Sequence, residues 1–157
     1  MGTIIVGVDT SGSITKKETQ EFASIIMDSI KYFKNVRVLV HDVDVHQDLT
    51  YDKDNILEFQ SMLATSGFKG GGGTSHGPIF KKIEHAYDED PDDISMAVFL
   101  TDAYSDIESV WNQYNWSKKV QIPTFFVITQ NGRFIGENAD SHKEKFKQIK
   151  INTVDDK

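Results

Sequence analysis

The sequence predicts an α/β fold in three layers, with a doubly wound, mainly parallel sheet that has one antiparallel edge strand. The first observation is that short, β-branched apolar segments alternate with segments whose apolar residues recur at helical spacing. The second is that helical segments separate most of the strands, which implies right-handed crossovers and helices on both faces of the sheet. Ligands bind to such sheets beyond the carboxyl ends of the strands, near the point where the strand order reverses.

The first 65 residues are expected to form three strands and two helices. Residues 3–8 and 36–41 are short, apolar and β-branched, which predicts buried strands. A short edge strand over 45–51 follows a turn near 42–44. Thr15 and Glu18 form a capping box that opens a helix, and residues 54–65 predict a second one. The apolar positions of the two helices are Phe22, Ile25, Ile26, Ile30 and Phe33, and then Ile56, Phe59, Met62 and Leu63.

The remaining chain begins with a glycine-rich loop, GFKGGGGTSHGP, at residues 67–78. Pro78 suits the first turn of a helix, which the apolar residues from Ile79 to Tyr87 continue. Strands are expected over 95–101 and 122–129, with a helix between them that carries Trp111. Residues 130–157 have the least regular pattern. They are expected to contain a turn at 131–132, a helix capped by Ser141 and Glu144, and a final strand over 148–154.

Composition bounds the class of protein. The 157 residues are expected to form one domain, 1–157, with 38% hydrophobic and 26% charged residues. A net charge of −7 disfavours binding to nucleic acids and anionic membranes, because these partners attract basic proteins. The same charge is compatible with binding cations. The absence of cysteine excludes disulfides, thiolate zinc sites and a thiol nucleophile, and it fits a cytoplasmic protein. No signal peptide or apolar run of membrane-spanning length is visible.

Five oxygen-bearing side chains are expected at one edge of the sheet. Asp9 ends the first strand and is followed by Ser11 and Ser13, whereas Asp102 ends a later strand. Thr74 lies in the glycine loop just before a helix, which places it at the same edge. Two carboxylates and three hydroxyls form a hard oxygen donor set, and Mg²⁺, Mn²⁺ and Ca²⁺ prefer such ligands. A turn with no metal also accounts for the Asp-Thr-Ser-Gly-Ser segment taken alone, because these residue types favour turns and caps.

Three motifs resemble a known family. VGVDTSGS, GGGT and LTDA match, in order and context, the metal-ion-dependent adhesion site of von Willebrand factor A (VWA) domains. The resemblance extends roughly from Thr3 to Val127 and implies a VWA or Rossmann-like fold. VLVHDVDV resembles the second strand and following turn of the bacterial VWA-like branch. In that branch the domain often follows a zinc-peptidase-like domain, and its genes lie near those of MoxR-type AAA+ ATPases.

The resemblance implies a division of labour at the site. Ser11, Ser13 and Thr74 are expected to bind Mg²⁺ or Mn²⁺ through their hydroxyls. Asp9 and Asp102 are expected to bind it through water or directly, and to orient the serines. An acidic side chain from a protein partner, with a MoxR-type ATPase as one candidate, would then complete the coordination. The chain is thus expected to be a metal-dependent protein-interaction module and not an enzyme.

Three residues deserve separate mention. Ala103 stands where the family has the glycine of Thr-Asp-Gly, which reduces backbone freedom beside the ion. His76 is expected to be a surface histidine near the rim, although such a residue could contact a partner or shift the metal preference. Trp116 follows a helix and could be an exposed partner contact.

Enzymatic alternatives use the same polar segments. A subtilisin-like triad would combine Asp9, His41 or His46, and Ser75. The histidine context of that family is missing. A haloacid-dehalogenase-like phosphatase would use Asp42, but its motif is broken because His46 stands two residues beyond the second aspartate. A third alternative is a VWA-like structural domain with no role for a metal.

Overall fold

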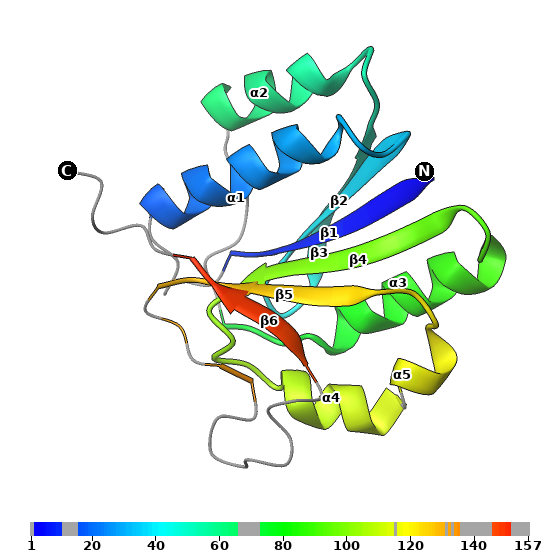
Figure 1. Ribbon diagram of the computed structural model, residues 1–157. Helices are drawn as coiled ribbons and strands as arrows, with labels where there is room; N and C mark the ends of the chain where they lie inside the picture. The colour runs from blue at the N-terminus through cyan, green and yellow to red at the C-terminus, as the bar shows by residue number, and fades with distance from the viewer. Residues whose placement is uncertain are drawn as a thin grey trace.

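Six strands form one sheet in the computed structural model of the chain, in the order β3-β2-β1-β4-β5-β6 (Figure 1). The structure describes residues 2–10, 16–65, 73–114, 116–130, 132, 134, 135 and 146–151. The strands are β1 (Thr3–Asp9), β2 (Asn35–His41), β3 (Val45–Tyr51), β4 (Ile94–Thr101), β5 (Thr124–Ile128) and β6 (Lys147–Lys150). The helices are α1 (Lys16–Ser29), α2 (Ile56–Thr65), α3 (Gly77–Glu89), α4 (Ile107–Tyr114) and α5 (Trp116–Lys119).

The pairing of the strands confirms the predicted topology. β1 lies in the middle, parallel to β2 on one side and to β4 on the other. β4, β5 and β6 are also parallel, whereas β3 runs antiparallel to β2 at the edge. The strand order reverses between β1 and β4, so the carboxyl ends of these two strands form the topological switch point.

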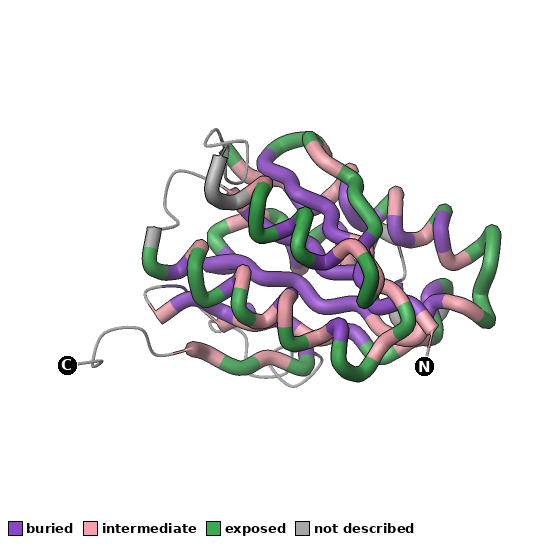
Figure 2. The backbone as a smooth tube through the Cα atoms, turned by 90° about the horizontal axis from the view of Figure 1, so that it is seen from above, coloured by how far each residue is buried: buried purple, intermediate pink, exposed green. Residues whose placement is uncertain are grey.

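Helices cover both faces of the sheet, and the central strands are buried on both sides (Figures 1 and 2). α1 and α2 pack on one face against alternate residues of β1, among them Ile4 and Val6. α3, α4 and α5 pack on the other face (Figure 1). Burial on both faces explains why β1 is a continuous apolar run and does not alternate between apolar and polar residues.

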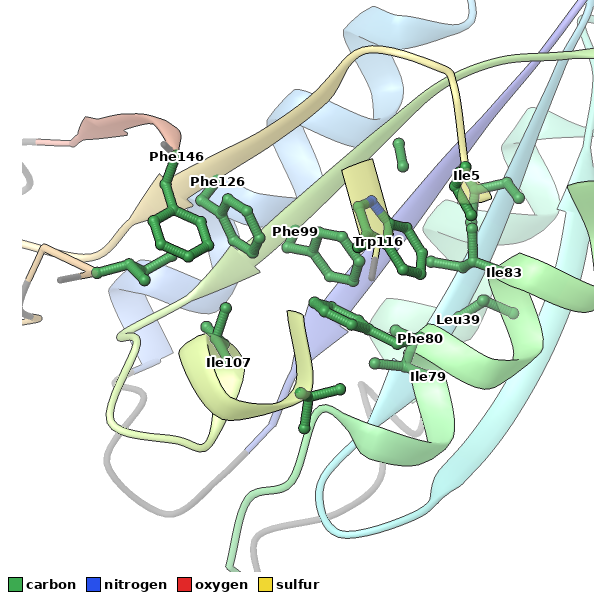
Figure 3. Packing of buried hydrophobic residues seen from close by; sticks show 14 of the residues in the cluster. Ile5, Leu39, Ile79, Phe80, Ile83, Phe99, Ile107, Trp116, Phe126 and Phe146 are labelled. Carbon is green, nitrogen blue, oxygen red and sulfur yellow. The ribbon is translucent and has the colours of Figure 1, made fainter. Parts of the chain in front are cut away.

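The core beneath α3, α4 and α5 combines aliphatic side chains with a group of aromatic rings in mutual contact (Figure 3). Phe99 of β4 and Phe126 of β5 stack with ring centroids 5.0 Å apart. Trp116 is 1% exposed, lies 4.5 Å from the ring of Phe80, and donates its Nε1 hydrogen to Thr124 Oγ1 at 3.2 Å. Trp116 is therefore not an exposed partner contact, because the rings of Phe80, Phe99 and Trp111 enclose its indole.

Several boundaries differ from the prediction. α1 ends at Ser29, so Ile30 and Phe33 pack from the turn after the helix. β5 spans Thr124–Ile128 and is shorter than the strand predicted over 122–129. β6 spans Lys147–Lys150 and begins one residue before the strand predicted over 148–154. Thr15, the expected 141–144 helix and residues 152–154 lie outside the described residues. Within the described chain, no helix has both the length and the apolar character needed to cross a membrane.

Gly7 permits the close packing of α3 on the sheet, and its substitution tests that packing. A Cβ atom at Gly7 would lie 2.6 Å from Ile79 Cδ1 and 3.0 Å from Phe99 Cδ1. Both neighbours are fully buried and have little room to move. We expect Gly7→Ala to lower the free energy of unfolding by about 1–3 kcal/mol in urea denaturation. Gly73→Ala is the control, because among the described residues its Cβ would meet Val43 alone, at an ordinary 3.6 Å. Equal stability of the two variants would contradict this account.

Candidate functional site

Two buried carboxylates lie at the ends of neighbouring strands at the switch point. Asp9 ends β1 and is fully buried, and Asp102 follows β4 and is 3% exposed. Thr101, the last residue of β4, donates its hydroxyl hydrogen to Asp9 Oδ2 at 2.6 Å. Asp102 Oδ1 accepts a hydrogen bond from the backbone N–H of Tyr104 at 3.0 Å. A buried carboxylate is costly unless it is hydrogen-bonded or paired, so these bonds fix where both groups lie.

Thr101 is a site residue that was not predicted from the sequence. Its Oγ1 donates to Asp9 and also accepts the backbone N–H of Ala103 at 3.1 Å, so one hydroxyl ties β1 to the loop that carries Asp102. The available signal was a polar residue at the end of an otherwise apolar strand. Within the LTDA motif, only Asp102 was predicted to lie at the site.

Thr74 lies in a segment that crosses the same edge of the sheet. The backbone N–H of Ser75 donates to the carbonyl of Asp42, just beyond the end of β2. The hydroxyl of Ser75 and the backbone N–H of His76 both donate to the carboxylate of Asp106, beyond the end of β4. Because β1 lies between β2 and β4, residues 73–76 pass across the end of β1, where Asp9 lies.

The structure thus brings three of the five predicted residues, Asp9, Thr74 and Asp102, to one edge. Ser11 and Ser13 lie outside the described residues. Among the residues that the structure describes, no three histidine or carboxylate side chains are grouped so that they could hold an ion.

The backbone at Asp102 is followed by a strained residue, Ala103, and is closely packed against Gly132. Ala103 has a φ of 64°, in the left-handed region that favours glycine. Gly132 packs against this backbone from the far side: a Cβ atom there would lie 2.5 Å from the carbonyl oxygen of Asp102. The turn after β5 therefore supports Asp102 by contact that only glycine allows.

Two buried histidines lie beside the carboxylates. His41 ends β2 opposite Asp9, and its ring lies 4.8 Å from that of His76, which immediately precedes α3. His76 is fully buried, so the expectation of a surface histidine at the rim is wrong. It packs against Phe80 and Phe99 in addition to His41, because α3 starts deep in the core.

The hydrogen bonds fix the protonation of both rings. Ser105 donates to Asp106, since a carboxylate only accepts, so Ser105 Oγ accepts the Nδ1 hydrogen of His76 at 2.8 Å. His41 Nδ1 likewise donates to the carbonyl of Asp42 at 3.3 Å. Within the described residues, the Nε2 atom of His76 has no hydrogen-bond partner. Burial lowers the pKa of His41, although the charge of Asp9 opposes the shift, and burial lowers the pKa of His76 well below its ordinary value.

Sequence comparison identifies the family. The profile of the VWA-like domain family (DUF2201) matches residues 4–133, most of the chain. The chain belongs to this VWA-like family. Among curated protein sequences, none gives a significant match.

Solved structures show the same fold at low sequence identity. The conserved hypothetical protein BatB from Bacteroides thetaiotaomicron superposes with a TM-score of 0.65 at 12% identity, covering 98% of this chain and 92% of that one. The SpRpn10 VWA domain gives a TM-score of 0.66 at 11% identity, covering 99% and 90%. The von Willebrand factor type A protein from Catenulispora acidiphila gives 0.64 at 14% identity, covering 96% of this chain and 38% of that one. At such identities the likeness concerns the fold alone.

The VWA-like domain arranges the residues of the enzymatic alternatives in other ways. Ser75 gives its hydroxyl hydrogen to Asp106 at 2.8 Å, so that hydrogen is not directed to a histidine base. Asp42 Oδ1 contacts His46 Nε2 at 2.6 Å and accepts the backbone N–H of Asp44. Burial opposes ionisation of Asp42, but these hydrogen bonds outweigh it and hold the pKa of the carboxyl below its ordinary value.

Removing the Thr101 hydroxyl tests whether it holds Asp9. Thr101→Val keeps the shape of the side chain but leaves the buried carboxylate and the N–H of Ala103 each without one partner. We expect a loss of about 2–3 kcal/mol in the free energy of unfolding, measured by urea denaturation at neutral pH. Thr101→Ser keeps the hydroxyl and should lose only about 1 kcal/mol for the missing methyl group. Equal stability of the valine and serine variants would show that the hydrogen bond from Thr101 to Asp9 does not stabilise the fold.

The burial of His41 and His76 predicts that the free energy of unfolding falls as the pH is lowered. The His76 ring stays neutral in the folded VWA-like domain, and the His41 ring takes up a proton less readily there than in the unfolded chain, where the ordinary pKa of a histidine is about 6.5. The free energy of unfolding therefore falls as the pH drops below about 6.5, by up to about 1.4 kcal/mol per pH unit from His76, and His41 adds a smaller contribution. Urea denaturation between about pH 8 and pH 5.5 measures this slope.

Matched variants assign that slope to the pair. His76→Phe should remove the larger part of the slope, because the pKa of His76 is lowered further than that of His41. His85→Gln is the control, since the side chain of His85 is 74% exposed at the surface of α3. An unchanged slope in His76→Phe would show that other groups cause the acid sensitivity.

Proposed function

We propose that this VWA-like domain is a protein-interaction module that binds its partner through a divalent metal ion, Mg²⁺ or Mn²⁺. The observation that carries the proposal is the pair of buried carboxylates at the switch point, with Thr74 crossing the same edge. Two buried acidic groups at neighbouring strand ends favour a cation beside them, because it offsets their mutual repulsion. Their oxygen donors are of the kind that Mg²⁺ and Mn²⁺ prefer.

The proposed ligands divide into hydroxyls and carboxylates. Ser11, Ser13 and Thr74 would hold the ion through neutral oxygens, as the family resemblance implies. Asp9 and Asp102 would bind it through water or directly. The bond from Thr101 fixes one oxygen of Asp9, so the carboxylate is oriented before any ion arrives. With few charged ligands, the ion keeps its attraction for an acidic group of the partner.

The partner in this proposal is a protein that offers an acidic side chain, and a MoxR-type AAA+ ATPase is the candidate class. The choice of this candidate is based on the resemblance to the bacterial VWA-like branch, whose genes lie near those of MoxR-type ATPases. We propose that the domain acts in the cytoplasm and breaks no bond. The engagement of Ser75 by Asp106 and of Asp42 by His46 supports a non-catalytic role.

Metal titration tests the proposal directly. Calorimetric titration of the metal-free protein with Mg²⁺ and with Mn²⁺ should show saturable binding. Asp9→Ala and Thr74→Ala should each weaken it by about 10–100-fold, because each removes a ligand or a group that orients one. Asp54→Ala is the control, since Asp54 is an exposed acid that follows β3 at the opposite edge of the sheet.

Two outcomes would contradict the proposal. One is a metal affinity that is the same in Asp9→Ala, Thr74→Ala and the unaltered chain. The other is the absence of saturable binding together with a crystal soaked in the metal that shows no ion between these residues. In either case a VWA-like structural domain without a metal would be the better description.

A further inference from the structure

The outer edge of β3 has no neighbouring strand in the part of the chain that the structure describes. β3 ends the sheet on one side, and it pairs there with β2 alone. The pairing is regular from Gln47 to Tyr51, and its one irregularity falls before Gln47. An edge strand directs the N–H and C=O groups of alternate residues outward, where a further strand can pair with them. Residues 47–51 are therefore a regular strand that is able to extend the sheet.

These residues lack the features that keep most edge strands apart. Proteins protect the edges of sheets with lysine, proline or bulges. Residues 47–51 contain no lysine, arginine, proline or glycine. Their one carboxylate, Asp48, accepts two hydrogen bonds from Arg37, each at 2.8 Å, and lies 3.3 Å from Lys82 Nζ. The charge of Asp48 is therefore largely offset within the chain.

β6, at the other end of the sheet, has a different edge. It is a strand of four residues with a lysine at each end, and Lys147 is exposed. Lysines on an edge strand disfavour pairing with another strand, because their charges would have to be buried or brought together. Of the two strands that end the sheet, β3 is therefore the one suited to pairing.

Leu49 stands at the centre of the regular run of β3 and is 40% exposed. It lies opposite Val38 of β2, so its side chain is on the face that α1 and α2 cover. Asp48 and Thr50 point to the other face, where Lys82 of α3 contacts Asp48. The strand thus presents an exposed apolar side chain on one face and an aspartate and a threonine on the other.

The run from Gln47 to Tyr51 is complementary to an antiparallel copy of itself. With Leu49 on a two-fold axis, the two Leu49 side chains lie opposite each other, and Asp48 of each copy lies opposite Thr50 of the other. The leucines then bury apolar surface, and the threonine hydroxyl can donate to the carboxylate. A register with Asp48 on the axis would oppose two carboxylates and include the irregular start of β3. The order of residues therefore favours a second copy of this chain, in one register.

We propose that two copies of this VWA-like domain associate through antiparallel pairing of their β3 strands, with Leu49 on the two-fold axis, so that one sheet continues through both copies. The inference goes beyond the proposed function and does not depend on a metal. Because the strands of the second copy run in the opposite direction, the edges that carry Asp9 and Asp102 face away from each other. Such a dimer presents two candidate sites to two separate partners.

Sedimentation of the full chain at increasing concentration tests the association. We expect a change from one chain to two over roughly micromolar to hundreds of micromolar concentrations, as befits a small interface. Leu49→Lys should weaken the association by about tenfold or more, because two ammonium groups would meet at the axis. An equal mixture of Leu49→Lys and Leu49→Glu should associate again, since opposite charges then face each other. Ile149→Lys is the matched control, because Ile149 is a 64% exposed apolar residue of β6.

A single cysteine tests the register. The chain has no cysteine, so Leu49→Cys introduces its only thiol. With residue 49 on the axis, the two thiols lie opposite each other and within reach of a disulfide. In oxidised glutathione we expect Leu49→Cys to form a covalent dimer severalfold faster than Thr50→Cys, which lies opposite Asp48 and not opposite itself. Ile149→Cys measures the rate of random collision.

Several results would overturn the inference. One is a chain that stays monomeric at the highest concentration. Another is a dimer that Leu49→Lys leaves intact, or that Ile149→Lys weakens as much. If the lysine and glutamate variants are both folded by circular dichroism but do not associate when mixed, residue 49 does not lie on a two-fold axis. Equal rates of disulfide formation in Leu49→Cys and Thr50→Cys would exclude the register. The metal titration is unaffected by all of these results, so this inference and the proposed function fail separately.

Discussion

The hydrogen bond from Thr101 to Asp9 joins the ends of β1 and β4, and the candidate site depends on it. β1 is the central strand, and its last residue carries a carboxylate that is fully buried. Such a group is tolerated only where donors are fixed around it. Thr101 supplies one at 2.6 Å and at the same time anchors the N–H of Ala103. The same hydrogen bond therefore stabilises this edge and orients the carboxylate that is proposed to bind a metal.

The site is supported from behind by contacts that leave little freedom. Gly132 allows the turn after β5 to lie against the backbone of Asp102, and His76 anchors the start of α3 within the aromatic core. Ala103 accepts a left-handed φ in this setting, a conformation that an alanine rarely adopts and that its surroundings must enforce. The described backbone behind Asp102 and before α3 is therefore closely packed. Such packing suits recognition, because few of these groups need to be ordered when a partner binds.

Much of the fold followed from the sequence, because β-branched runs and helical spacing are local signals. Asp9 and Asp102 could be brought together by topology alone, since both follow parallel strands. The burial of His76 and Trp116 could not be predicted, because each depends on rings that lie far away in the sequence. Thr101 was missed for a similar reason: its hydroxyl acquires a role only when β4 lies beside β1.

The antiparallel β3 and the position of β4 have a consequence for the order in which the chain gains its parts. β2 and β3 form a hairpin joined by a short turn, whereas β1 and β4 pair residues as distant as Thr3 and Ile94. Closing that long loop costs more conformational entropy than closing the hairpin. Both carboxylates lie on the long-range pair. A chain that has not completed its central sheet therefore lacks the edge at which Asp9 and Asp102 lie, and the binding proposed for this edge would be confined to fully folded chains.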